Sequence, residues 1–157
     1  MDSSSDEMKI IIPKGCDNAP RKQIVIDFTV AILKQQNEIV EEYADESIVW
    51  FQLKDNKKIE SLSSLITIFQ EENKDIIETL EVYQVITHGK FASINGVISL
   101  ANGTKVDFCD VYIFSNTAKS GKVKEIKSYR VAGQVESWIE INLVYISWVV
   151  GRNLWKT

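Results

Sequence analysis

Hydrophobic positions change their spacing along the chain, from a helical period in its first half to a strand-like alternation later. Ile24, Phe28 and Ile32 recur every four residues, which predicts an amphipathic helix with Pro20 in its first turn. Ser61 precedes another apolar stripe of helical spacing and is suited to cap that helix. The first half is therefore expected to form three helices, over residues 21–36, 37–46 and 61–73.

Residues typical of β-structure predict one strand between the second and third helices and four more strands after the third. These five segments are 47–53, 77–89, 90–100, 104–115 and 122–133. Turn residues at 101–103 and 116–121 indicate hairpins. Helices followed by consecutive antiparallel strands are typical of an α+β domain. The basic stretch 119–130 is interpreted as a solvated edge of the sheet.

The two ends of the chain differ from this central domain. Residues 1–8 are polar and are expected to be disordered, while 9–16 are expected to form an extended arm packed on the body. We predict a single domain over 9–134 and an apolar extension over 135–157. The apolar stretch 138–150 is too short and too interrupted to span a membrane. It could form another strand, lie between subunits, act as a docking arm or add little to the fold.

Composition excludes several classes of protein. A net charge of −4, with no basic patch, argues against nucleic-acid binding. His88 is the one histidine, and Cys16 and Cys109 lack metal-ligand spacing, so we expect no metal site and no cofactor. The N-terminus lacks the features of a signal peptide, which favours a cytoplasmic protein that does not bind membranes.

Several segments resemble the SnoaL-like superfamily, also called nuclear transport factor 2-like. "EEYADESIVWFQL" resembles the end of a helix and the first strand of that family, and "NGTKVDFCDVYIFS" with "GKVKEIKSYRV" resembles its last two long strands. "KIIIPKGCDNAP", "DESIVW", "THGK" and "SINGVISLANGTK" are similar to small bacterial members of unassigned function. The resemblance covers about residues 9 to 133.

This resemblance implies a cone-shaped α+β fold, in which three N-terminal helices pack on a strongly curved mixed or antiparallel sheet. A pocket would open at the wide end, and a homodimer would form through the outer face of the sheet. Members of the superfamily include isomerases, dehydratases, cyclases and binding proteins, so the fold alone does not give the function.

Asp110 is the strongest candidate for a functional residue, because strand alternation puts it on one face with aromatic side chains. On that face it could act as a general base, or it could be a structural carboxylate held by backbone amides, Tyr129 or Arg130. His88 could assist it as an acid or base, or could lie at the rim. The aromatic residues expected to line the pocket are Phe28, Trp50, Phe108, Tyr112, Phe114 and Tyr129.

The isomerase-like relatives carry a catalytic base on the first strand, and Phe51 falls near that place here. The first helix has Asp27 or Phe28 where those enzymes have a tyrosine. The leading hypothesis is therefore a homodimer that binds a small apolar or aromatic ligand without catalysis. The alternatives are an isomerase, dehydratase or hydrolase with Asp110 as general base, and a protein-interaction module that uses the tail.

Overall fold

The computed structural model describes residues 7–15, 19–71 and 75–132. Within these ranges the chain is α+β, with three α-helices and one mixed sheet. The helices are α1 (Pro20–Lys34), α2 (Asn37–Tyr43) and α3 (Leu62–Glu71). The predictions for 1–6 and for 133–157 concern residues outside the described part of the chain.

Seven strands form the sheet in the spatial order β1-β4-β5-β6-β7-β2-β3. They are β1 (Lys9–Ile11), β2 (Ala44–Gln52), β3 (Lys57–Glu60), β4 (Ile77–His88), β5 (Phe91–Leu100), β6 (Lys105–Phe114) and β7 (Val123–Ala132). A short 3-10 helix, η1 (Leu53–Asp55), joins β2 to β3. The β1–β4 and β2–β7 pairs are parallel and the other pairs antiparallel, so the sheet is mixed.

The three predicted helices are present, and Ser61 caps α3 by accepting the backbone N–H of Ser64 at 3.2 Å. Two strand predictions were wrong. β7 lies between β6 and β2, so it is not an edge strand. The pattern also missed β3, because only Ile59 of that charged segment is buried.

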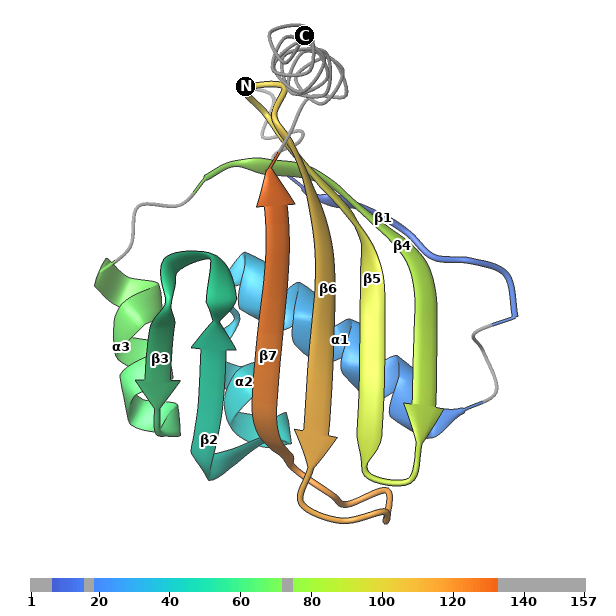
Figure 1. Ribbon diagram of the computed structural model, residues 1–157, viewed down its shortest axis with the longest axis vertical. Helices are drawn as coiled ribbons and strands as arrows, with labels where there is room; N and C mark the ends of the chain where they lie inside the picture. The colour runs from blue at the N-terminus through green and yellow to red at the C-terminus, as the bar shows by residue number, and fades with distance from the viewer. Residues whose placement is uncertain (1–6, 16–18, 72–74, 133–157) are drawn as a thin grey trace, which may run out of the picture.

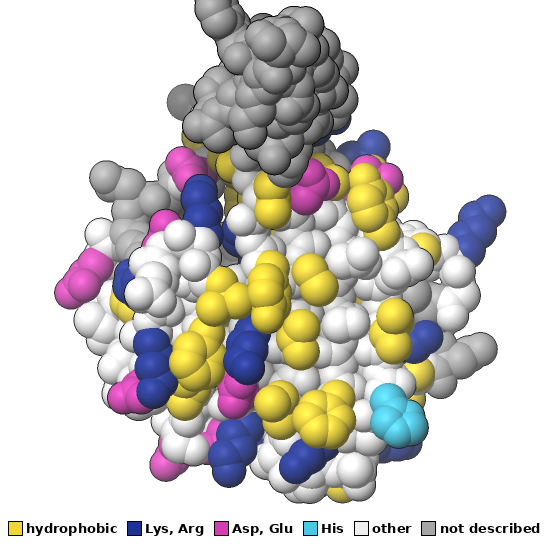
Figure 2. Space-filling view, in the orientation of Figure 1, with side chains coloured by type: hydrophobic (Ala, Val, Ile, Leu, Met, Phe, Trp, Pro, Cys, Tyr) yellow, Lys and Arg dark blue, Asp and Glu magenta, His cyan; other side chains and the backbone are white. Residues whose placement is uncertain are grey.

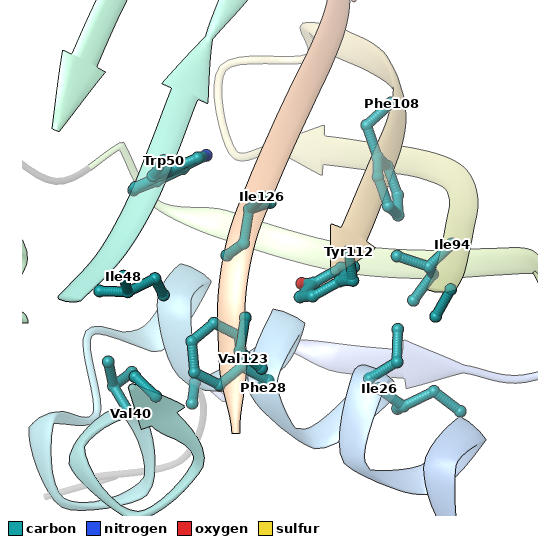
Figure 3. Packing of buried hydrophobic residues seen from close by; sticks show 14 of the residues in the cluster. Ile26, Phe28, Val40, Ile48, Trp50, Ile94, Phe108, Tyr112, Val123 and Ile126 are labelled. Carbon is teal, nitrogen blue, oxygen red and sulfur yellow. The ribbon is translucent and has the colours of Figure 1, made fainter. Parts of the chain in front are cut away.

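One face of the sheet is covered by helix. In Figure 1, α1 crosses behind β5, β6 and β7, while α3 lies beside β3 at an edge of the sheet. The apolar stripe of α1 includes the buried residues Val25, Ile26 and Phe28. Figure 3 shows Phe28 and Ile26 directed toward side chains from the covered face of the sheet, among them Ile94, Tyr112 and Ile126. The core therefore lies between α1 and this inner face.

The opposite, outer face carries the alternate side chains of the strands. On β6 these include Cys109, Val111 and Ile113, none of which is fully buried. Figure 2 views this face and shows hydrophobic side chains gathered over the strands.

The N-terminal arm departs from expectation. Ile10 and Ile11 of β1 pair with β4, and Ile12 follows them in the chain. All three side chains nevertheless stay more than a third exposed.

Candidate functional site

The inner face of β6 carries a carboxylate among aromatic rings. Phe108, Asp110, Tyr112 and Phe114 are all 3% exposed or less. The ring of Tyr112 meets Phe28 of α1 edge-on, with centroids 6.0 Å apart, and stacks on Phe114 at 6.4 Å. A buried carboxylate in such surroundings needs a partner, because transferring a charge out of water is costly.

Arg130 is that partner. Antiparallel pairing sets Asp110 opposite Ser128, and Arg130 lies two residues further along the same face of β7. Its Nη1 contacts Oδ1 of Asp110, and its Nη2 donates to Oδ2 at 3.0 Å. The two side chains are 5% and 19% exposed, and the Arg130 guanidinium also lies 5.2 Å from the Phe108 ring centroid. The pair is bidentate, which is the strong geometry for arginine and carboxylate.

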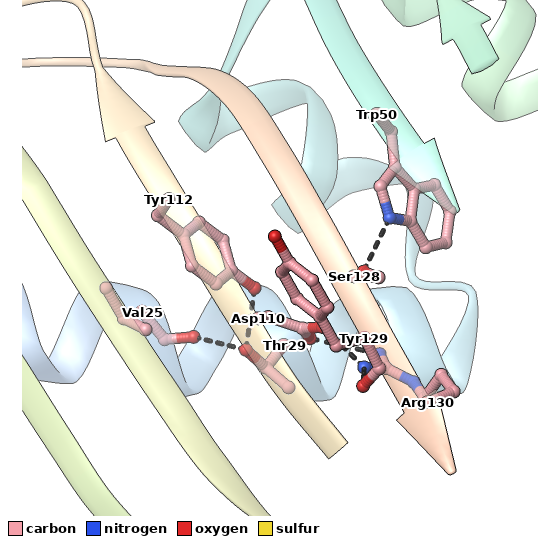
Figure 4. A network of polar contacts seen from close by, with 8 residues as sticks. All are labelled: Val25, Thr29, Trp50, Asp110, Tyr112, Ser128, Tyr129 and Arg130. Carbon is pink, nitrogen blue, oxygen red and sulfur yellow. Dashed lines mark hydrogen bonds and ion pairs between the residues drawn. The ribbon is translucent and has the colours of Figure 1, made fainter. Parts of the chain in front are cut away.

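Three further hydrogen bonds satisfy the neighbouring polar groups (Figure 4). Trp50 of β2 donates its indole N–H to Oγ of Ser128 at 2.7 Å. Thr29 of α1 donates to the carbonyl of Val25 at 2.7 Å, and its oxygen lies 2.7 Å from the Tyr112 hydroxyl. Because the single Thr29 hydrogen is already used, Tyr112 is the donor in the bond between the two hydroxyl groups.

Tyr112 is held in its neutral form. Burial, with a smaller effect from the nearby Asp110 charge, raises the pKa of Tyr112 well above the usual tyrosine value. The hydroxyl is thus a hydrogen-bond donor across the physiological range and cannot serve as a tyrosinate base there.

A cleft opens beside this network. It has a volume of about 510 Å³ and lies between the end of α1, η1 and the inner face of the sheet. Its lining residues are Ile32, Trp50, Gln52, Lys54, Asp55, Lys57, Val106, Ser128 and Arg130. A volume of this size is typical of small-molecule sites. Behind it, a second cavity of only about 10 Å³ touches Thr29, Asp110 and Tyr112.

Arg21 covers the other end of the β6 face. Its guanidinium lies 3.9 Å from the Phe114 ring centroid and donates to the backbone carbonyls of Asn116 and Ala118 in the β6–β7 turn. Burial lowers the pKa of Arg21. This packing covers Phe114, at the opposite end of β6 from Val106, which lines the cleft.

Six of the predicted site residues line the cleft, line the small cavity or lie in the core. Trp50 lines the cleft and the small cavity, while Asp110 and Tyr112 line only the small cavity. Phe28, Phe108 and Phe114 are buried in the core and line neither.

Two predicted residues lie elsewhere. Tyr129 is 46% exposed and pairs with Cys109 on the outer face, so it does not share a cavity with Asp110. His88 ends β4, is exposed, and lines neither cavity next to Asp110. Tyr129 is therefore not placed to line a pocket with Asp110, and His88 is not placed to assist it.

Phe51 also differs from the expected placement. Its ring lies on the outer face, with the amines of Lys58 and Lys127 at 5.6 and 5.8 Å from its centroid. The cleft side of β2 instead presents Trp50 and Gln52. Neither carries a carboxylate, so β2 supplies no acid or base to the cleft.

Sequence reasoning missed several cleft residues. Lys54 and Lys57 lie in a charged stretch between a predicted strand and a predicted helix, and such connecting segments commonly form the rim of a pocket. Ser128 and Thr29 gave no sequence pattern, because short hydroxyl side chains are common on any element. Within the described ranges, no group of three histidine, cysteine, aspartate or glutamate side chains is placed to hold a metal ion.

No protein-family model matches the chain, and no curated protein matches it by sequence. Solved structures do match its fold. One is named as a SnoaL-like polyketide cyclase from Shewanella denitrificans (11% identity, 70% of this chain and 89% of that one, TM-score 0.60). Another is a nuclear transport factor 2-like protein from Burkholderia xenovorans (18%, 74% and 93%, TM-score 0.53).

A third similar structure, from Catenulispora acidiphila, is a hypothetical protein with a ketosteroid isomerase-like fold in complex with trimethylamine (8%, 68% and 84%, TM-score 0.55). At these identities the likeness shows the fold alone, and that fold is the SnoaL-like, nuclear transport factor 2-like one. The resemblance read from the sequence is confirmed at this level.

No helix among residues 7–15, 19–71 and 75–132 is long and apolar enough to cross a membrane.

Proposed function

We propose that this protein is a cone-shaped small-molecule-binding protein, which holds an uncharacterised ligand with an apolar surface in the cleft beside Trp50. In this proposal Asp110 anchors the structure and does not act as a base. The observation that carries the non-catalytic role of Asp110 is the bidentate contact of Arg130 with both of its carboxylate oxygens.

The cleft supports the binding part of the proposal. Ile32, Trp50 and Val106 give it an apolar wall, and Ser128 and Arg130 give it polar groups that could orient a ligand. A few polar groups set in an apolar hollow are typical of ligand sites. The C. acidiphila structure, which holds trimethylamine, is a protein of this fold with a small molecule bound.

The surroundings of Asp110 argue against the enzymatic alternative. A general base needs a free oxygen within hydrogen-bond reach of the substrate. Both oxygens of Asp110 are engaged by Arg130, and the cavity of about 10 Å³ beside it has room for about one water molecule at most. His88 is too far along the sheet to assist, since it pairs with Phe91 while Asp110 pairs with Ile94.

The outer face supports a homodimer as part of the same proposal. Ile86, Phe91, Tyr129 and Val131 are each between 46% and 59% exposed on this face. Exposed apolar side chains gathered on one face are a common mark of a protein–protein contact. A second copy of the chain would cover them.

A matched pair of tryptophan variants tests the binding site. Val106 lines the cleft, while Val131 lies near the same end of the sheet on the outer face. Compounds that raise the melting temperature of the wild type in a small-molecule screen should fail to stabilise Val106→Trp and should still stabilise Val131→Trp. Equal stabilisation of both variants, or a screen without any binder, would overturn the proposal.

A further inference from the structure

The last described strand ends beside the cleft. Ala132 pairs with Val106, which lines the cleft, and it lies two residues beyond Arg130, which lines the cleft as well. β7 runs parallel to β2, so both strands point toward the end of the sheet where β2 leads into η1 (Figure 1). The chain therefore leaves the sheet next to the cleft.

Large apolar side chains stay exposed at the same end of the sheet. Leu53 of η1 is 44% exposed, and Ile76, which directly precedes β4, is 56% exposed. The carbonyl of Ile76 accepts the backbone N–H of Ala101, in the turn between β5 and β6, at 2.9 Å. Together with Trp50 and Val106 of the cleft wall, these two side chains give the cleft end an apolar surface that suits a contact with another apolar segment.

The sequence that follows β7 has the composition to cover that surface. Residues 138–150 are hydrophobic at every position except Glu140, Asn142 and Ser147. Leaving so many apolar side chains in water is unfavourable, because their hydration opposes exposure. This stretch therefore needs an apolar surface to pack against.

The connection between β7 and this stretch is long enough. Residues 133–137 join it to Ala132, and an extended chain advances about 3.3 Å per residue, so the stretch can begin up to about 20 Å from Ala132. Register partners place Val106, Ile98 and Leu80 one strand further each time. Neighbouring strands are about 4.8 Å apart, so the cleft and the beginning of β4 both lie within this reach.

We propose that residues 138–150 dock on the cleft end of their own chain, with apolar side chains against Leu53, Ile76 and the wall of the cleft. The chain leaves the sheet at this place, its apolar stretch requires cover, and the exposed side chains lie within its reach. The docked segment narrows the mouth of the cleft and lies across the way in to Trp50. This inference goes beyond the proposed function, because the contact requires no ligand.

Hydrogen exchange measured by mass spectrometry on the full chain tests the proposal. In the wild type, we expect the amides of 138–150 to exchange at least about tenfold more slowly than those of a free peptide of the same sequence. The double variant Leu53→Lys/Ile76→Lys places two charges on the docking surface, and it should return the exchange of the segment to the rate of the peptide. Because both substituted positions are exposed, exchange in β5 and β6 should stay unchanged.

Phe91→Lys is the matched control. Phe91 is 50% exposed, and it pairs with His88, at the other end of β4 from Ile76. This variant should leave the exchange of 138–150 as it is in the wild type. A tenfold dilution of the wild type should also leave it unchanged, since the segment and its surface belong to one chain.

Each other result contradicts the inference. Exchange of the wild-type segment at the rate of the peptide means that the segment is not docked, and equal protection in the double variant means that it docks elsewhere. Loss of protection in Phe91→Lys assigns the segment to the outer face, and loss on dilution assigns it to a second copy. A compound screen without any binder overturns the proposed function and leaves this inference standing.

Discussion

Arg130 on β7 reaches diagonally across to Asp110 on β6 and engages both oxygens of its carboxylate. The two residues belong to neighbouring strands and share the inner face, so the pair joins the strands beneath α1. The Arg130 guanidinium lies near the ring of Phe108, which belongs to the aromatic core, and Arg130 also lines the cleft. The same arginine thus neutralises a buried charge and offers donors to the hollow next to it.

The pair predicts an asymmetry between single and double variants. Asp110→Asn should lower the free energy of unfolding by about 3 kcal/mol, because it leaves the Arg130 cation without its counter-charge. The apolar double variant Asp110→Leu/Arg130→Met should lie close to the wild type, since it removes both charges together. Urea unfolding of the three proteins measures this. A double variant as unstable as the single one would show that the pair contributes more than mutual neutralisation.

The strand period of two was enough to place Asp110 with Phe108 and Tyr112, because residues two apart on a strand share a face. The same reasoning gives no answer on β2, and on β7 it misplaced Tyr129. In "SIVWFQL" the four residues from Ile48 to Phe51 are all apolar, so alternation does not say whether Trp50 or Phe51 points inward. In "KSYR" the serine and arginine face inward and Tyr129 faces out, against the usual preference, because Arg130 serves Asp110 on the neighbouring strand. That pairing depends on register, which local sequence does not contain.

The position of β2 could not be predicted for a similar reason. It follows α2 in the sequence but pairs in parallel with β7, which lies more than seventy residues later. Only this long-range pairing brings Trp50 beside Ser128 and places η1, with Lys54, at the rim of the cleft.

Tyr112 predicts a dependence of stability on alkaline pH. Because burial raises its pKa, the folded protein keeps the hydroxyl protonated where the unfolded chain, with a tyrosine pKa of about 10, loses the proton. The folded state then binds more protons than the unfolded state, so stability falls as the pH rises above about 10. Below that pH the contribution of Tyr112 is fully present.

The variant Tyr112→Phe isolates this effect. At neutral pH it should lose about 1 kcal/mol, because the hydrogen bond to Thr29 disappears. Above pH 10 its stability should fall less steeply than that of the wild type, which carries the extra titrating group. Urea titrations at neutral and alkaline pH give both slopes. The other tyrosines are common to both proteins, and parallel slopes would contradict the argument.

Gly96 predicts a steric effect in the middle of β5. A Cβ atom at this position would lie 1.9 Å from the backbone oxygen of Glu81 on β4, a distance that no relaxed structure permits. Gly96→Ala should therefore force β4 and β5 apart and cost about 3 kcal/mol or more, within the range of strained core substitutions. Gly103→Ala is the comparison, because its turn has open space but a φ of +87°. We expect it to cost about 1 kcal/mol, and an equal cost for the two would refute the steric argument.

The outer face predicts the state of assembly. Ile86 is 59% exposed on β4, on the same face as Phe91 and Tyr129. If a second copy covers this face, Ile86→Lys places a charge in an apolar contact and should convert a dimer into a monomer. Gln23→Lys, at an exposed position of α1 on the opposite side of the sheet, introduces the same charge away from the outer face and should leave the dimer intact. Light scattering coupled to size exclusion gives the mass of each protein, and a wild type that is monomeric at all concentrations would end the case for this interface.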